Sequence, residues 1–152
     1  MDPNKKNLLT LERYLPYRLS VLSNKVSGKI AQSYKDKFAL SITEWRIMAV
    51  LGEYPGVSAD EVSVKTQIEK SLISRAVSKL LQRQLICRTL SKEDKRRSEL
   101  HLSNTGTEVY NEIVPLSLEY ERKLLSCLNS EQEQQLSQII DQLYQRANEM
   151  KL

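Results

Sequence analysis

Residues 86–102 restrict the fold more than any other segment, because they interrupt a chain whose apolar residues are otherwise spaced as in helices. The runs ICRTL and ELHL are short and β-prone, and eight polar residues separate them. This pattern predicts a β-hairpin with a long charged loop. The loop contains four basic residues: Lys92, Lys95, Arg96 and Arg97. Packing like charges together does not stabilise a chain, so the cluster indicates a negatively charged partner. The alternative is a mobile, solvated loop.

Three predicted helices lead up to this hairpin. Ser41 with Glu44, and Ser58 with Glu61, have the spacing of capping boxes that open two of them. The third and longer helix, in the stretch from residue 68 to 86, has its apolar residues on one face. Its opposite face carries Lys70, Ser71, Ser74, Arg75 and Ser78, with Lys79 beside them. Helices in this order followed by a hairpin predict a winged helix-turn-helix.

Further amphipathic helices are predicted on both sides of this module. Apolar residues recur every three or four positions in 16–38, 105–128 and 130–150. We expect Ser130 and Glu133 to cap the last helix and Pro115 to kink the one before it. These helices are too apolar to stand alone in water. The expected fold class is therefore mainly α with a small β-hairpin.

The charge of the chain is concentrated around the longer helix and the hairpin. The net charge is +4, yet residues 65–101 hold ten Lys or Arg against four Asp or Glu. A local positive field of this kind predicts a polyanion partner, and the alternative is a well-solvated surface. No run approaches the roughly 18 apolar residues of a membrane span, so no membrane partner is expected. The start of the sequence lacks the long apolar segment of a secretory signal, which predicts a cytoplasmic protein.

Residues for catalysis or metal binding are sparse. The chain has one histidine, His101, and two distant cysteines, Cys87 and Cys127. These are too few to form a typical transition-metal site, so neither a metal nor another cofactor is expected. No Ser/His/Asp set, Cys/His pair or glycine-rich phosphate loop is recognisable, which argues against an enzyme.

The polar helix face has the chemistry of a DNA reader. A helix fits the major groove of B-DNA, and Arg75 is suited to a bidentate contact with guanine. Leu72 lies near this face and could meet a thymine methyl group or pack against the preceding helix. Arg96 or Arg97 in the hairpin loop could enter the neighbouring minor groove, where negative potential is focused.

The chain resembles the MarR family of bacterial winged-helix transcriptional regulators from about Tyr17 to Met150. The most specific part is the hairpin signature D-x-R-x-x-x-L followed by a Leu, a Thr and a Gly. These residues are Asp94, Arg96, Leu100, Leu102, Thr105 and Gly106. The stretches LSITEWRIMAVL, which contains Trp45, and SLISRAVSKLLQRQLI also look like the family's helices. One departure is Gln84, where the family usually has glycine, so the turn there is expected to differ.

The resemblance implies roles for these segments. Asp94 would orient the hairpin, or wing, and Arg96 would enter the minor groove. Residues 1–152 would form one domain, with a DNA-binding lobe at 41–104 and dimerisation helices at 8–38 and 105–152. A homodimer would bind a pseudopalindromic operator with half-sites about one helical turn apart. In a bacterium such a cytoplasmic protein would associate with the nucleoid when bound to DNA.

Many members of the family release DNA when a small aromatic acid or phenolic ligand binds. The residues here that could serve such an effector are Tyr14, Tyr17, Arg18, Tyr34, Trp45 and Tyr110. The alternative is that these tyrosines belong to a core or a dimer interface, as tyrosines at helical spacing usually do. The function predicted from the sequence is thus a homodimeric, ligand-responsive DNA-binding repressor. The alternatives are a winged-helix protein-interaction module and a DNA-binding regulator that needs no effector.

Overall fold

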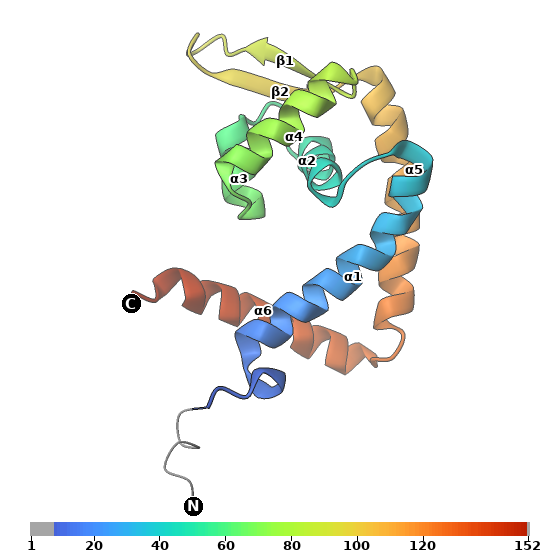
Figure 1. Ribbon diagram of the computed structural model, residues 1–152, viewed down its shortest axis with the longest axis vertical. Coiled ribbons are helices and arrows are strands. Elements are labelled where there is room, and N and C mark those ends of the chain that lie inside the picture. Colours follow the sequence, from blue (N-terminus) through green and yellow to red (C-terminus); the bar gives the residue numbers. More distant parts are fainter. Residues whose placement is uncertain (1–7, 152) are drawn as a thin grey trace, which may run out of the picture. The chain divides into compact units, whose positions relative to one another are not determined.

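The computed structural model describes residues 8–151 and shows within them helices and a single β-hairpin (Figure 1). In chain order the elements are η2 (Leu11–Arg13), α1 (Leu15–Phe38), α2 (Ile42–Glu53), α3 (Ala59–Thr66), α4 (Lys70–Gln82), β1 (Ile86–Leu90), β2 (Ser98–Leu102), α5 (Asn104–Leu125) and α6 (Ser130–Glu149). The expected fold class, mainly α with a small β-hairpin, is confirmed. Among the described helices, none is long and apolar enough to cross a membrane.

The chain divides into two compact units, and the boundary falls between Val114 and Pro115, inside α5. The first unit contains the elements from η2 to β2 and the start of α5. The second contains the rest of α5 and α6. Pro115 lacks the backbone N–H that would complete the helical hydrogen bonds, which gives this boundary a physical basis. The division into a lobe at 41–104 and dimerisation helices at 8–38 and 105–152 stays a prediction.

Capping boxes begin three of the helices, as side chains satisfy backbone N–H groups that have no partner within the helix. At α2, the Glu44 N–H donates to Ser41 Oγ and the Ser41 N–H to Glu44 Oε1, both at 3.1 Å. Ser58 and Glu61 form the same box at α3, as predicted. The prediction for α6 was wrong by one residue. Its box is formed by Asn129 and Gln132, and Asn is as good an N-cap as Ser.

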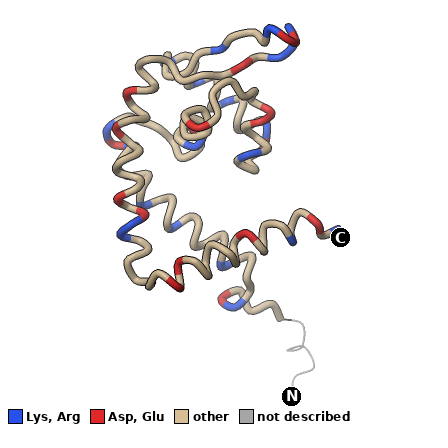
Figure 2. Tube along the Cα trace, turned by 180° about the vertical axis from the view of Figure 1, so that it is seen from behind, with Lys and Arg blue, Asp and Glu red and all other residues tan. Residues whose placement is uncertain are grey.

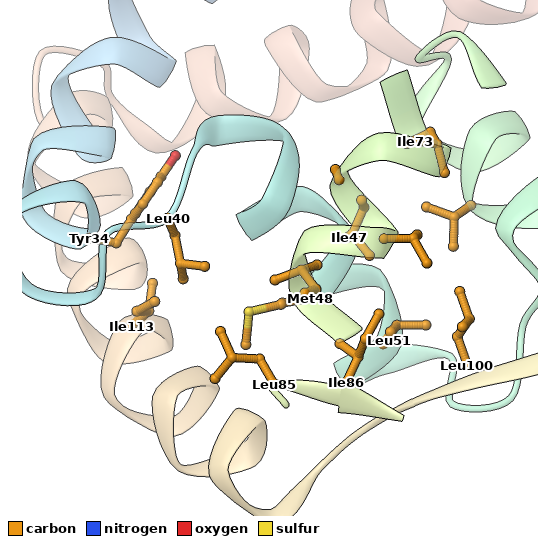
Figure 3. Close-up of a cluster of buried hydrophobic side chains, with 14 of the residues drawn as sticks. Tyr34, Leu40, Ile47, Met48, Leu51, Ile73, Leu85, Ile86, Leu100 and Ile113 are labelled. Atoms are coloured by element: carbon orange, nitrogen blue, oxygen red, sulfur yellow. The ribbon is translucent and has the colours of Figure 1, made fainter. Parts of the chain in front are cut away.

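The hydrophobic core of the first unit lies between α2, α4 and the hairpin (Figure 3). Ile47, Met48 and Leu51 on α2 are buried there. They meet apolar residues from neighbouring elements: Leu40, Val62, Ile73, Val77, Leu80, Ile86, Leu100 and Ile113. Burial of this apolar surface fixes α4 by one face, and its other face is therefore left for solvent or a partner.

The hairpin, which we call the wing, comprises β1, the loop 91–97 and β2. The strands pair antiparallel, from Ile86 opposite Leu102 to Leu90 opposite Ser98. The connection before α3 adds two backbone hydrogen bonds to the other side of β2. Gly56 N–H donates to the Leu100 carbonyl oxygen, and Leu100 N–H donates to that of Val57, both at 2.9 Å. The base of the wing is thereby attached to the segment that leads into α3.

A tight turn joins α4 to β1 and packs against the start of α5. Gln84 adopts the left-handed conformation, with φ of 59°. Ser103 Oγ donates to the Gln84 carbonyl oxygen at 2.6 Å and accepts from the Gly106 N–H at 2.9 Å. A Cβ atom on Gly106 would overlap the carbonyl oxygen of Leu85. The turn therefore tolerates a left-handed glutamine and requires a residue without a side chain at position 106.

Candidate nucleic-acid interface

Helix α4 has two chemically distinct faces. Ile73, Ala76, Val77 and Leu80 are buried in the core. The side chains predicted to contact DNA from this helix are all exposed: Lys70, Ser71, Ser74, Arg75, Ser78 and Lys79. We call these six residues the α4 polar face. The helix contains no Asp or Glu, so this face combines short hydroxyl groups with positive charge.

A shallow groove of about 210 Å³ runs between α4 and the beginning of α2. Arg75, Lys79 and Leu72 line it from α4, and Ser41 and Thr43 line it from α2. Leu72 is 43% exposed, so the structure favours its availability to a partner over burial. Sequence reasoning did not include Ser41 or Thr43 among the site residues. The available signal was the Ser41 cap, because the N-terminus of a helix attracts anions.

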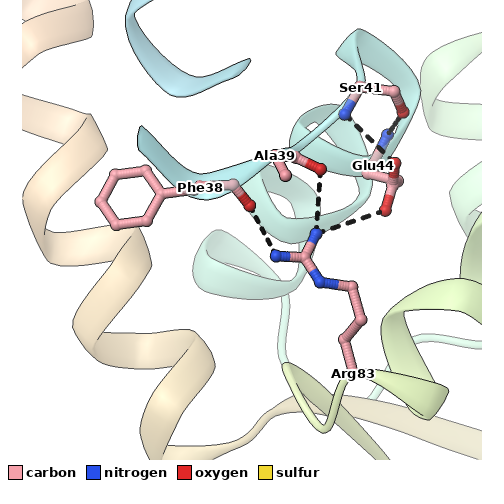
Figure 4. A network of polar contacts seen from close by, with 5 residues as sticks. All are labelled: Phe38, Ala39, Ser41, Glu44 and Arg83. Carbon is pink, nitrogen blue, oxygen red and sulfur yellow. Dashed lines mark hydrogen bonds and ion pairs between the residues drawn. The ribbon is translucent and has the colours of Figure 1, made fainter. Parts of the chain in front are cut away.

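Arg83, directly after α4, ties the end of this helix to two others (Figure 4). Its guanidinium donates to the carbonyl oxygen of Phe38 at 2.5 Å and to that of Ala39 at 3.0 Å, at the end of α1. The same group lies 4.0 Å from the carboxylate of Glu44, which is buried at the start of α2. A planar guanidinium with several donors can satisfy all three partners at once. The orientation of the α4 polar face therefore depends on this arginine.

The loop of the wing is folded by its own hydrogen bonds. Ser91 Oγ accepts from the N–H groups of Glu93 and Asp94 at 3.3 Å. Asp94 Oδ1 accepts from the Arg96 N–H at 3.0 Å. The Arg97 N–H donates to the Asp94 carbonyl oxygen at 2.9 Å. The structure thus places Asp94 at the centre of the loop, where it can orient the wing as the family resemblance implied.

The cations of the wing differ in their surroundings. Lys95 and Arg96 are exposed at the tip, where a short acidic segment lies between basic ones (Figure 2). Arg97, in contrast, forms an ion pair with Glu61 of α3. A groove of about 590 Å³ between the wing and the start of α3 is also lined by Arg88. Sequence reasoning missed Arg88. Its proximity to the loop depends on the strand register, which loop length alone does not fix.

The six residues considered for an effector fall into two groups. Tyr34 is 1% exposed, and its ring centroid lies 5.9 Å from that of Trp45, which is itself 5.9 Å from that of Tyr110. Burial raises the pKa of Tyr34, and the charge of Arg46 offsets part of this effect. The other three, Tyr14, Tyr17 and Arg18, are exposed around the start of α1. The structure does not gather all six into one pocket.

A third groove, of about 440 Å³, lies along the first turns of α1. Tyr17, Arg18 and Lys25 contribute polar groups to it, and leucines contribute apolar surface.

Across residues 8–151, no group of three His, Cys, Asp or Glu side chains is placed to hold a metal ion. Cys87 and Cys127 are free thiols at exposed positions.

Comparison with known proteins finds similarity to MarR-family regulators. A model described as MarR family matches residues 40–97, from just before α2 through the loop of the wing. The HTH-type transcriptional regulator BilQ of Clostridium symbiosum (strain WAL-14163) is 29% identical over 112 residues, covering 74% of this chain and 78% of that protein. A crystal structure of a MarR/EmrR family regulator from Acinetobacter sp. ADP1 matches with a TM-score of 0.86 and 28% identity, over 93% of this chain and 100% of that one. The chain is thus similar to MarR-family regulators, in sequence over residues 40–97 and in fold over most of its length.

BilQ and the Acinetobacter protein are both transcriptional regulators, and the second shares the winged helix-turn-helix fold of this chain. Two more distant structures share the fold. The S. aureus MepR–DNA complex matches with a TM-score of 0.79 at 18% identity, over 88% of this chain and 98% of that one. PcaV from Streptomyces coelicolor, in complex with its natural ligand, matches with a TM-score of 0.75 at 18% identity, over 92% and 98%.

Proposed function

We propose that this protein is a homodimeric repressor of the MarR family that inserts α4 into the major groove of a pseudopalindromic operator. The observation that carries the proposal is the division of α4 into a buried apolar face and an exposed polar face without acidic residues. Such a helix can lie against the negatively charged duplex without repulsion and without exposing core residues. The structural similarity to the MepR–DNA complex supports this use of the fold.

Within the α4 polar face, we assign base reading to Arg75 and positioning to its neighbours. Arg75 is exposed near the centre of the face, and an arginine there can bond O6 and N7 of one guanine. Lys70 and Lys79 lie towards the two ends and can neutralise phosphates. The serines can bond phosphates or bases while allowing close approach.

The wing is assigned to the adjacent minor groove. Lys95 and Arg96 extend from the folded tip of the loop and are exposed. An arginine in a narrow minor groove gains from the focused negative potential there. Asp94 holds the Arg96 backbone and thereby directs its side chain.

A homodimer is proposed because each unit exposes an apolar row that is costly in water. Leu15, Leu19 and Leu22 are exposed on α1, and Ile139, Ile140 and Leu143 are exposed on α6. A second copy of the chain could cover these rows, as the family resemblance implies. The two α4 helices of the homodimer would then have to lie about 34 Å apart to enter successive major grooves.

The effector part of the proposal concerns the groove along the first turns of α1. The structure of PcaV with its natural ligand shows that a protein of this fold can hold a small molecule. In this chain, the α1 groove offers Arg18 to a carboxylate and Tyr17 to an aromatic ring. A ligand that binds one spacing of the α4 helices more tightly than another would release the operator. The competing proposal is a regulator that responds to no effector.

The decisive experiment is a titration at controlled salt of the purified protein against an operator selected from random duplexes, beside a scrambled duplex of equal length. We expect Arg75→Ala to weaken operator binding by about 1–3 kcal/mol and to change scrambled-duplex binding much less. Arg75→Lys, the matched control, keeps the charge but cannot form the bidentate contact, so it should resemble Arg75→Ala.

Two outcomes would count against the proposal. Equal loss on both duplexes would reduce Arg75 to a phosphate contact, and selection of no preferred sequence would leave only a basic surface. Benzoate or a simple phenol added to the operator complex tests the effector. Release of the operator with retained scrambled-duplex binding would support it, and no release at millimolar ligand would favour effector-independent regulation.

A further inference from the structure

Arg97 is held differently from the other cations of the wing. Its guanidinium forms an ion pair with Oε1 of Glu61 on α3. The other oxygen of the same carboxylate, Oε2, accepts the Ser58 N–H at 3.2 Å and so caps the helix. Because Glu61 is fixed by its own helix, its carboxylate is a stationary partner for the wing. Lys95 and Arg96 reach solvent from the same loop.

This ion pair attaches the wing to α3 in addition to the contacts at the base of the wing. Those contacts include the pair of backbone hydrogen bonds that join Leu100 to Gly56 and Val57. Arg97 comes three residues before Leu100, on the side of the tip, and three residues span about 10 Å along an extended strand. The base of the wing is therefore fixed by the backbone, and the part nearer the tip is fixed by Arg97 and Glu61.

The loop transmits this attachment to its tip. Arg97 N–H donates to the Asp94 carbonyl oxygen at 2.9 Å, and the Arg97 carbonyl oxygen accepts the Ser91 N–H at 2.8 Å. Both bonds close the loop around Asp94, which also holds the Arg96 N–H. A loop folded in this way moves with Arg97, so the position of Arg96 relative to α4 follows from the Arg97–Glu61 pair.

We propose that Arg97 is a positioning residue that, through Glu61, holds the wing at the angle at which Arg96 enters the minor groove while α4 lies in the major groove. On this view Arg97 does not itself contact DNA, in contrast to the role expected from the sequence. The proposal rests on the proposed mode of DNA binding. The ion pair is partly exposed, and exposed pairs add little to the free energy of unfolding. We therefore expect its loss to change DNA affinity rather than the stability of the fold.

The test compares Glu61→Gln, Arg97→Gln, the double variant and Arg96→Ala on the selected operator over a range of salt concentrations. Glutamine at position 61 keeps an oxygen for the cap of α3. We expect Glu61→Gln and Arg97→Gln each to weaken binding by up to about fivefold, with the double variant no worse than either. Arg96→Ala removes one cation from each of the two wings of the dimer, so it should lower the slope of log K against log salt by about 1.8, and Arg97→Gln should leave that slope nearly unchanged.

The sign of the Glu61→Gln effect separates the two roles of Arg97. Removing a negative charge beside DNA strengthens binding by simple electrostatics, so a weakening would have to come from the lost attachment. Stronger binding of Glu61→Gln, together with a slope lowered by about 1.8 in Arg97→Gln, would overturn the proposal and make Arg97 a phosphate contact in both wings. Arg97→Lys can still reach Glu61 and should retain more binding than Arg97→Gln.

A measurement without DNA tests the attachment itself. Trypsin cleaves after the lysines and arginines of the loop, and cleavage tracks how often a segment opens. We expect Glu61→Gln to be cut faster there than the wild type, and Glu108→Gln, which removes an exposed acidic charge from α5 outside the loop, to be cut at the wild-type rate. Unchanged cleavage of Glu61→Gln would refute the attachment. Unchanged operator binding and salt slope in Arg96→Ala would instead refute the proposed wing contact.

Discussion

Two adjacent residues, Arg83 and Gln84, determine how α4 ends and where β1 begins. Arg83 bonds the last carbonyl groups of α1 and lies near Glu44, which links three helices at one point. Gln84 then turns the chain through the left-handed conformation. A side chain in that conformation is strained by roughly 1 kcal/mol, whereas glycine is not. A substitution that removes this strain could therefore raise the free energy of unfolding at an exposed position outside the proposed DNA surface.

This strain gives a prediction for Gln84→Gly. Relief of the left-handed side chain should raise the free energy of unfolding by up to about 1 kcal/mol, reduced by the greater freedom of glycine in the unfolded chain. Urea unfolding at a fixed protein concentration measures the difference. Asn tolerates this conformation better than Gln, so Gln84→Asn should lie between the two. A Gln84→Gly protein less stable than the wild type would contradict the account.

Among the elements, the start of α5 is the one whose sequence is most tightly constrained by packing. Ser103 caps it by accepting the Gly106 N–H and also bonds the carbonyl oxygen of Gln84. Gly106 lies directly on the backbone of Leu85. The glycine of the wing signature is thus explained by close contact between the helix and the turn after α4. This contact sets the direction in which α5 leaves the wing.

Gly106→Ala is expected to destabilise the protein by about 1–3 kcal/mol, because two backbones would have to separate to admit a methyl group. Thermal unfolding followed by circular dichroism measures this. Gly28 in α1 supplies the matched control, since a Cβ there meets no atom within 4 Å. Gly28→Ala should stabilise by about 0.5–1 kcal/mol through helix propensity. Equal effects of the two substitutions would remove the packing argument.

Local patterns in the sequence were sufficient to predict the elements, and they failed where distant residues meet. The caps at Ser41 and Ser58 and the hairpin depend on spacing within a few residues, and the structure has them. The cap of α6 was misplaced by one residue because Asn129 and Ser130 are both good candidates. The pairing of Arg97 with Glu61 joins residues 36 positions apart, which no local pattern reveals. Local patterns also did not reveal that Tyr34 is buried while Tyr17, on the same helix, is exposed.

At the scale of the whole molecule, both units expose apolar rows on their helices, and we attribute these rows to assembly. Exposed side chains on α6 recur at three- and four-residue spacing, as in a helix that packs along another: Leu136, Ile139, Ile140 and Leu143. Operator binding by two α4 helices requires that assembly, because a single helix contacts only one half-site. Loss of the dimer should therefore cost affinity without changing either DNA-contacting element.

Ile140→Glu should shift the protein towards monomer and weaken operator binding by at least tenfold, since half of the contacts are lost with the partner. Gln138→Glu adds the same charge on the other side of α6 and should remain dimeric. Light scattering after size-exclusion chromatography and operator titration at matched concentrations measure both properties. A dimeric Ile140→Glu protein with unchanged operator affinity would exclude this face of α6 from the interface.

The two faces of α4 also have a consequence for how the protein can change over time. Substitutions on exposed helix positions usually alter stability by less than about 0.5 kcal/mol, whereas those at Ile73, Val77 or Leu80 disturb the core. Ser71, Ser74, Arg75 and Ser78 can therefore be exchanged while the scaffold is preserved. A gene duplicate could acquire a new operator through a few such exchanges, and an engineer could redirect the protein to a chosen promoter by the same route.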